Sequence, residues 1–343
     1  MHNSIVTMPN GDKELGDFTA RTNKNWTTFV WVITQQCNLG CPYCVGFKYR
    51  GVAKSLVDTL KVDGIVSRFE RLRDKYKKNI YITLTGGEPS IIKDFPKLCA
   101  ALTKRKFTIE LQTNLTTSTI KPFVDSVDPG CVGQIMASYH GWKLDKDSKI
   151  HDIYMENFKY ATNNNILCVL KTIILPTKTE NLQKYVSKLQ SELPPGAPIL
   201  TWVFIRGIPK SLKDFAGAYP YSYTPAQKNL IKKSTVYRKH CQLLYMNGAG
   251  FFKGMRCDAG RGFVVMDWSG KTTRCYTTRQ GTTGYLGDFT KETIKINNKP
   301  IACPAKFCGT PFWGMWYGVD PWNYVPNLDK KNAYYCRFGP KVP

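Results

Sequence analysis

Apolar runs of strand type alternate with amphipathic stretches of helix type from about residue 26 to residue 240. This alternation leaves few folds open, because a strand, a helix and a second strand in succession form a parallel βαβ unit. Six such units predict an α/β protein with a parallel sheet and outer helices, arranged as an open or closed barrel of the TIM type. The expected strands lie near 28–35, 79–84, 107–112, 132–138, 166–174 and 199–205, and the expected helices near 54–77, 94–105, 117–125, 151–164 and 178–192.

The pattern changes near residue 240, where Gly, Cys and aromatic residues become frequent. A helix near 224–239 is expected to connect the two parts. Residues 261–276 predict a β-hairpin that turns around Gly270. The expected organisation is a polar lead, a barrel and a small cysteine-rich domain, at 1–25, 26–240 and 241–343.

The composition indicates a folded protein of the cytoplasm. The chain has 343 residues and 42% hydrophobic content, which is enough for a substantial core. No run of 18 apolar residues predicts a membrane helix, and the first 20 residues lack the pattern of a secretory signal. The cytosol keeps thiols reduced, so the clustered members of the 12 cysteines indicate metal binding or catalysis rather than disulfides.

The formal net charge is +24, from 49 Lys and Arg against 25 Asp and Glu. Such an excess favours polyanions, phosphorylated substrates or acidic peptides as partners. The alternative is a lysine-rich solvated surface, because the basic residues are spread along the chain.

Cys37, Cys41 and Cys44 form a CxxxCxxC group in the loop directly after the first expected strand. Functional groups of a parallel barrel gather on the loops after the strands' carboxyl ends, so position and composition agree. Three thiolates on a 4Fe-4S cluster leave one iron open to a substrate or cofactor. The alternative, a structural zinc loop, needs a fourth ligand that is missing nearby.

Gly86, Gly87 and Glu88 follow at the end of the second expected strand. The two glycines expose backbone N–H and C=O groups, and the Glu88 carboxylate is able to receive an ammonium group. A glycine pair alone predicts only a turn. Its place one βα unit after the three cysteines favours a ligand site.

Together these residues resemble the radical S-adenosylmethionine (radical SAM) superfamily. The resemblance rests on the three cysteines, on Tyr43 before the last of them, and on the Gly86-Gly87-Glu88-Pro89 stretch. It implies a partial (β/α)6 barrel in which Cys37, Cys41 and Cys44 hold a 4Fe-4S cluster whose open iron chelates S-adenosylmethionine. It also implies that the Gly-Gly-Glu stretch receives the methionine amino group. One electron, from a reductant such as flavodoxin or ferredoxin, then cleaves the sulfonium to a 5'-deoxyadenosyl radical.

Further contacts to S-adenosylmethionine are expected from polar residues at the ends of later strands. The resemblance points to Asn114 after the third strand, Ser138 after the fourth and Lys171 on the fifth, with an ordinary strand-end role as the alternative for each. Asn114 and Ser138 fit best, because a short polar side chain meets a ribose hydroxyl without filling the pocket. His140 is the candidate catalytic acid or base, with a structural role as the alternative.

A second cysteine group follows the barrel. Cys257 and Cys275 flank Gly270 in a CX12GX4C pattern that resembles the hairpin of the SPASM and twitch extensions behind radical SAM barrels, and Cys303 and Cys308 come later. A hairpin brings its end cysteines together, and a later loop can add a second pair. The resemblance implies one auxiliary 4Fe-4S cluster on these four cysteines.

Only Cys336 lies further downstream, which favours the shorter, twitch-like form with a single auxiliary cluster. The wide spacing between Cys303 and Cys308 leaves open that Cys336 replaces one of them. A four-cysteine zinc ribbon is the structural alternative.

The substrate is open at this point. The basic charge favours a nucleotide, a nucleic acid or a related small anionic substrate, and an auxiliary cluster that accepts an electron favours a net oxidation. The second hypothesis is a maturase of ribosomal peptides, which the short lead of residues 1–25 disfavours because such enzymes usually begin with a leader-binding domain. The third is a non-catalytic iron–sulfur redox or scaffold protein.

Overall fold

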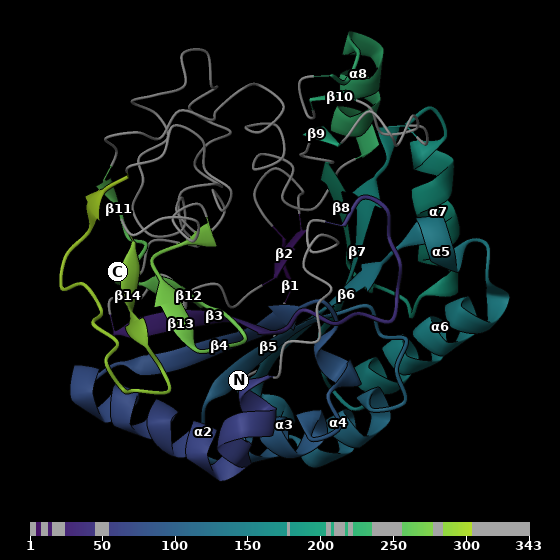
Figure 1. Cartoon of the computed structure of the whole chain (residues 1–343). Helices are drawn as coiled ribbons and strands as arrows, with labels where there is room; N and C mark the ends of the chain where they lie inside the picture. Colours follow the sequence, from purple (N-terminus) through teal and green to yellow (C-terminus); the bar gives the residue numbers. More distant parts are fainter. Residues whose placement is uncertain are drawn as a thin grey trace.

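A curved, mostly parallel sheet organises the computed structural model of the chain (Figure 1). The structure describes residues 5–7, 13–15, 25–44, 55–176, 179–203, 207–208, 217–218, 222–234, 256–276 and 284–303. Six parallel strands form the barrel wall: β3 (Trp26–Thr34), β4 (Asn79–Gly86), β5 (Thr108–Thr113), β6 (Val132–Tyr139), β7 (Cys168–Ile174) and β8 (Ile199–Val203). Each pairs with the next in chain order. The predicted α/β barrel with six strands is confirmed.

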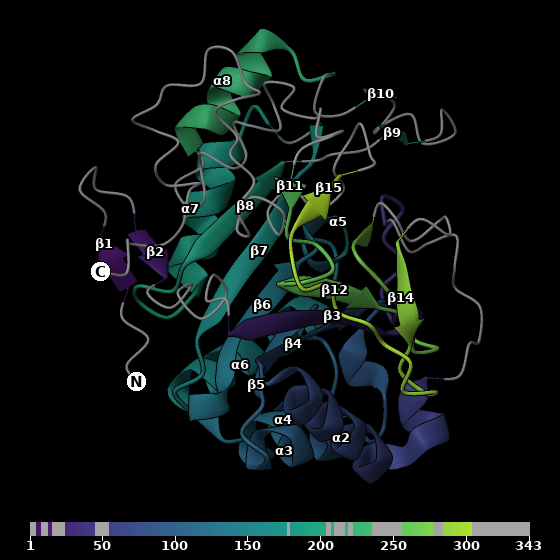
Figure 2. The same ribbon diagram turned by 90° about the vertical axis from the view of Figure 1, so that its left-hand side faces the viewer.

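Helices cover the outer face of this sheet, as Figures 1 and 2 show. They are α2 (Leu56–Tyr76), α3 (Phe95–Lys104), α4 (Ile120–Ser126), the short α5 (Gly141–Leu144), α6 (Ser148–Asn163) and α7 (Leu182–Glu192), with two 3-10 turns at Pro89–Ile91 and Pro129–Cys131. The connections between the strands match the helices that the sequence predicted. The sheet and helices therefore form a partial barrel whose strands carry their carboxyl ends to one mouth.

Aromatic side chains fill the layer between α2 and the sheet. The ring centroid of Phe69 on α2 lies 5.5 Å from that of Phe29 and 6.1 Å from that of Trp31, both on β3. Phe289, far away in the sequence, completes the cluster at 4.7 Å from Phe69. These buried rings fix the strand that ends in the cysteine loop.

The inner face of β4, β5 and β6 is polar. The Glu110 carboxylate, which is buried, accepts hydrogen bonds from Tyr81 Oη and Gln134 Nε2 at 3.0 Å each and from Gln112 Nε2 at 3.2 Å. Gln112 in turn accepts one from Thr85 at 3.2 Å. Since a buried polar network must be satisfied to be stable, these bonds hold the barrel interior in one arrangement.

The cysteine-rich segment joins the barrel sheet directly. β12 (Phe263–Met266) and β13 (Lys271–Thr273) form the predicted antiparallel hairpin, and β14 (Tyr285–Asp288) pairs with β13. Gly270 occupies the turn with a φ of 89°, where glycine is favoured. β12 also pairs in parallel with β3, so the sheet order is β14-β13-β12-β3-β4-β5-β6-β7-β8. This pairing was not expected from the sequence.

Shorter elements complete the described parts. They are the strand pairs β1 (Ile5–Thr7) with β2 (Lys13–Leu15), β9 (Gly207–Ile208) with β10 (Gly217–Ala218) and β11 (Arg256–Cys257) with β15 (Ile301–Ala302), and the helix α8 (Pro225–Ser234). α8 begins where the sequence predicted, while residues 235–239 of that prediction lie outside the described residues. Among the helices that the structure describes, none has the length and apolar character to cross a membrane.

Candidate functional site

The cysteine loop leaves β3 at the mouth of the barrel. Cys41 is buried, and Cys37 and Cys44 are half-buried. A turn closes the loop through the hydrogen bond from Cys44 N to Cys41 O at 3.1 Å, and Leu39 N lies 3.4 Å from Cys37 Sγ. An N–H group aimed at sulfur stabilises a thiolate, so the backbone of the loop suits a metal-bound Cys37.

The three thiols on one loop equal in number the protein ligands of a 4Fe-4S cluster with one open iron. Each cysteine of a 4Fe-4S cluster binds a different iron, so its ligands stand further apart than those of one zinc ion.

Gly86 and Gly87 bring the end of β4 against the cysteine loop. Gly87 N donates to Thr34 O at 2.8 Å, and Glu88 N donates to Gln36 O at 2.7 Å. A Cβ atom on Gly86 would lie 2.3 Å from Thr34 O, and one on Gly87 would lie 2.1 Å from Gln36 O. Both positions therefore require glycine, because the backbone that approaches them belongs to the loop that carries the cysteines.

The Glu88 carboxylate is buried at the end of β4. The side chain is only 1% exposed, and its oxygens accept hydrogen bonds from Ser90 N at 3.1 Å, Ser90 Oγ at 2.5 Å, Thr113 Oγ1 at 2.6 Å and Asn114 N at 2.6 Å. Burial raises the pKa of Glu88, and these hydrogen bonds oppose the effect. The carboxylate ties the end of β4 to the end of β5.

Asn114 extends this connection to the cysteine loop. Its Nδ2 lies 2.9 Å from Asn38 Oδ1 and 3.9 Å from Cys37 Sγ, and Asn38 Nδ2 donates to Thr116 Oγ1 at 2.8 Å. The Asn114 side chain is 3% exposed. The sequence predicted Asn114 as a ribose contact, and the structure places it beneath the loop, against a cysteine.

Tyr43 and His140 meet on the other side of the loop. Tyr43 Oη lies 3.1 Å from His140 Nδ1, and Tyr43 is 5% exposed. Burial, followed by the nearby Cys41 thiol, raises the pKa of Tyr43. Burial and the Lys171 charge lower the pKa of His140 to about 4, so its imidazole is neutral at neutral pH.

Ser138 and Lys171 are paired neighbours on β6 and β7. Lys171 Nζ lies 4.9 Å from the ring centroid of Trp202 on β8, a cation–π distance. Both side chains are half-buried, so they remain accessible as candidate contacts.

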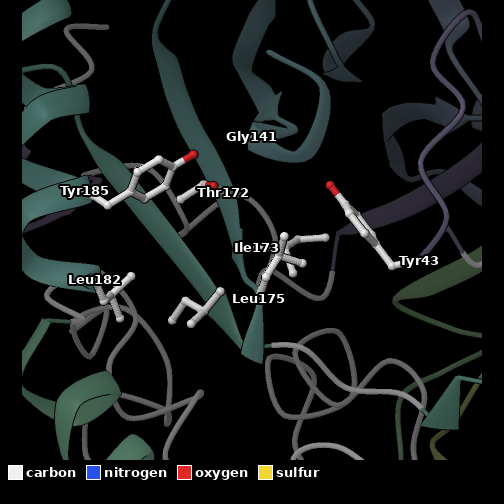
Figure 3. A pocket seen from close by; sticks show the side chains of 8 residues that line it. Tyr43, Gly141, Thr172, Ile173, Leu175, Leu182 and Tyr185 are labelled. Atoms are coloured by element: carbon white, nitrogen blue, oxygen red, sulfur yellow. The ribbon is translucent and has the colours of Figure 1, made fainter. Parts of the chain in front are cut away.

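A pocket adjoins the cysteine loop through Tyr43 (Figure 3). Tyr43 and Tyr185 enter it from opposite sides with their hydroxyl groups toward the interior, and a Cβ on Gly141 would lie 2.1 Å from Tyr185 Oη. Sequence reasoning missed Tyr185 and Gly141, because neither stands in a motif. The lining residues are Tyr43, Gly141, Thr172, Ile173, Ile174, Leu175, Leu182 and Tyr185.

The second cysteine group is partly described. Cys257 and Cys275 are buried and Cys303 is half-buried. Burial has the largest effect in raising the pKa of Cys257 to about 11; the Cys303 and Cys275 thiols add to the rise, and the Arg274 charge opposes it. Cys257 on β11 pairs with Ile301 on β15, two residues before Cys303, so the structure brings these two cysteine segments together. Cys308 and Cys336 lie outside the described residues.

The His140 environment gives a testable pH dependence. The unfolded imidazole takes its proton near pH 6.5 and the folded one near pH 4, so the stability that the neutral form contributes is lost as the pH falls through this window. In histidine-labelled, iron-free protein, we expect the His140 ring signal in NMR spectra to stay unshifted until the pH approaches about 5. A His140→Gln variant identifies the signal. A midpoint at or above the ordinary histidine value would contradict the assigned environment.

Residues 31–188 match the family model of the radical SAM superfamily. Over 71 residues the chain is 35% identical to GTP 3',8-cyclase of Psychromonas ingrahamii, a match covering 20% of this chain and 20% of that protein. The solved structure of native anSMEcpe with bound AdoMet is similar at 15% identity and a TM-score of 0.56, over 79% of this chain and 81% of that one. SuiB of Streptococcus suis bound to precursor peptide SuiA is similar at 12% identity and a TM-score of 0.50, over 93% and 71%.

At these identities the solved structures establish a shared fold. The family match runs across the cysteine loop and the Gly86–Glu88 stretch, and thus across the two segments that the structure joins at the barrel mouth. The chain is therefore similar to the radical SAM superfamily over the part that holds both segments. The curated relative is matched over one fifth of its own length.

Proposed function

We propose that this protein is a radical SAM enzyme that cleaves S-adenosylmethionine reductively at Cys37, Cys41 and Cys44. The observation that carries the proposal is the attachment of the cysteine loop to the ends of β4 and β5, through Gly87, Glu88 and Asn114. The three thiolates would hold a 4Fe-4S cluster, which when bound would supply the one-electron reduction that cleaves the sulfonium and so starts hydrogen abstraction from the substrate.

The contribution of the chain itself is positioning. Glu88 fixes Asn114, Asn114 supports Cys37 and Asn38, and the two glycines allow the loop to lie close against β4. A site can hold reacting groups in alignment only when neighbouring residues fix the position of its ligands, as these contacts do for the cysteine loop. Ser138 and Lys171 on the inner wall are the proposed contacts for polar groups of S-adenosylmethionine.

His140 is proposed to act as a neutral group. Its low pKa makes it a hydrogen-bond partner rather than a cation at neutral pH, and Tyr43 Oη at 3.1 Å fixes the orientation of its ring. A neutral imidazole at the mouth can accept a proton from a substrate after oxidation.

The test of the proposed activity is release of 5'-deoxyadenosine. Protein reconstituted with iron and sulfide without oxygen, then supplied with dithionite and S-adenosylmethionine, should form this product. Omission of dithionite is the control. If both cysteine groups are loaded with iron and no 5'-deoxyadenosine forms, the non-catalytic redox or scaffold hypothesis replaces the proposal.

We also propose an auxiliary 4Fe-4S cluster on Cys257, Cys275, Cys303 and Cys308. The pairing of β11 with β15 brings the Cys257 and Cys303 segments together, and Arg274, next to Cys275, donates hydrogen bonds to both segments, which supports this site. A cluster here would accept an electron from the substrate radical, which favours a net oxidation.

For the substrate we propose a nucleotide, a nucleic acid or a related anion. The net charge of +24 and the local similarity to GTP 3',8-cyclase support this class. A peptide substrate is the second candidate. It is favoured by the structural similarity to SuiB bound to its precursor peptide, a match that covers 93% of this chain.

Salt dependence separates these classes. If the substrate is a nucleic acid, we expect binding to a single-stranded oligonucleotide at low salt that weakens by at least about tenfold between about 50 and 200 mM salt, measured by fluorescence anisotropy. Absence of binding at low salt would remove the nucleic acid version and leave a small anion or a peptide.

A further inference from the structure

Arg274 is a buried arginine next to Cys275. Its side chain is 6% exposed. Nε donates to Ala259 O at 3.1 Å, Nη1 to Ala302 O at 3.4 Å and Nη2 to Ile301 O at 3.4 Å. Ala259 follows Cys257 by two residues, and Ala302 directly precedes Cys303. One guanidinium therefore joins the three segments that carry the described cysteines.

The site is shaped for this side chain. Gly260 has a φ of 95°, and a Cβ there would lie 3.0 Å from Arg274 Cγ and 2.6 Å from Asn297 Nδ2. A larger residue at this position would displace the arginine. The guanidinium distributes its donors over three nitrogens in a planar fork, so each carbonyl meets a different nitrogen, whereas a lysine carries all its donors on one nitrogen.

The charge of Arg274 is the second part of the argument. All three acceptors are backbone carbonyls, so these bonds do not neutralise the guanidinium. A buried positive charge gains from a negative neighbour. A cluster bound by four thiolates carries net negative charge, and local charge is one of the factors that set its reduction potential.

We propose that Arg274 is a positioning residue for the auxiliary cluster, which it serves by holding three cysteine segments together and by stabilising the reduced state. The inference rests on the proposed auxiliary site. It assigns to Arg274 two separable effects, one on how much iron the site retains and one on its midpoint potential.

The experiment uses the full chain with Cys37, Cys41 and Cys44 replaced by alanine, so that only the auxiliary group can bind iron. We expect this parent to hold about four irons after anaerobic reconstitution. Arg274→Met should lower the iron by at least about threefold, and the cluster that remains should have a more negative potential. Arg274→Lys keeps the charge and loses the fork, so iron should fall while the potential stays near that of the parent.

Arg71→Met is the matched control. Arg71 on α2 forms a two-bond ion pair, at 2.6 and 2.8 Å, with Glu292 of the C-terminal region, and these bonds involve none of the cysteine segments. Its loss should leave iron and potential unchanged. Equal iron and potential in Arg274→Met and the parent would overturn the proposal.

Two other outcomes would also overturn it. If iron-free Arg274→Met loses hydrogen-exchange protection in β12 and β13 relative to the iron-free parent, Arg274 serves folding and not cluster positioning. If the parent without the three barrel cysteines binds no iron, the auxiliary site itself is absent. The proposed enzymatic function is judged separately, by release of 5'-deoxyadenosine from the chain with all its cysteines.

Discussion

Replacing Cys37, Cys41 and Cys44 together by alanine is expected to abolish 5'-deoxyadenosine release and to lower bound iron from about eight to about four atoms per chain. The reason is that the three thiols lie on one loop after β3, whereas Cys257 lies on β11, in the separate two-stranded sheet of β11 and β15. Iron determination and product analysis on the same reconstituted samples check both parts.

Cys99→Ala is the matched control for this result. Cys99 is fully buried on α3, and burial raises its pKa well above the ordinary thiol value, so it is a core residue. Its replacement should leave iron at the level of the unchanged protein. If the unchanged protein held only about four irons, the assignment of an auxiliary cluster to the second cysteine group would be wrong. If the triple variant still cleaved S-adenosylmethionine, the role proposed for the three barrel cysteines would be contradicted.

Gly87→Ala is expected to lower the rate of S-adenosylmethionine cleavage by about a hundredfold, because a shift of about 1 Å in a reacting group has this order of effect. The added Cβ would lie 2.1 Å from Gln36 O, so either the loop or the strand end must move. The cause is close approach alone, since Gly87 does not have a positive φ. Single-turnover formation of 5'-deoxyadenosine measures the effect.

Gly64→Ala on α2 is the matched control, since its added Cβ would have no neighbour nearer than 3.5 Å. Its rate should equal that of the unchanged protein. Circular dichroism and iron content show whether Gly87→Ala is folded and loaded. A folded, fully loaded Gly87→Ala with the unchanged rate would mean that the contact between β4 and the cysteine loop does not position the site.

The sequence was sufficient to predict the barrel because its information is local. Each parallel strand is buried on one or both faces and reads as an apolar run, as Ile80–Leu84 and Cys168–Leu170 do. The hairpin around Gly270 could be predicted for the same reason, since strand character and turn chemistry lie within a few residues of each other.

The remaining features depend on contacts between distant segments. In the sequence, a carboxylate after two glycines predicts an exposed ligand group. In the structure, Glu88 is buried and accepts hydrogen bonds from Ser90, Thr113 and Asn114. Likewise, nothing in the sequence pairs Tyr43 with His140. Such pairings arise when strand ends converge at the mouth, and a single sequence carries no periodic signal for them.

The parallel pairing of β12 with β3 decides how this protein can be divided. β3 is the first strand of the barrel in chain order, yet it is not an edge strand of the described sheet, because β12 occupies its outer side. A chain cut between the barrel and the hairpin would expose a long row of unpaired backbone groups on β3, and such an edge invites association between copies. The two cysteine groups are therefore better separated by point substitution than by truncation.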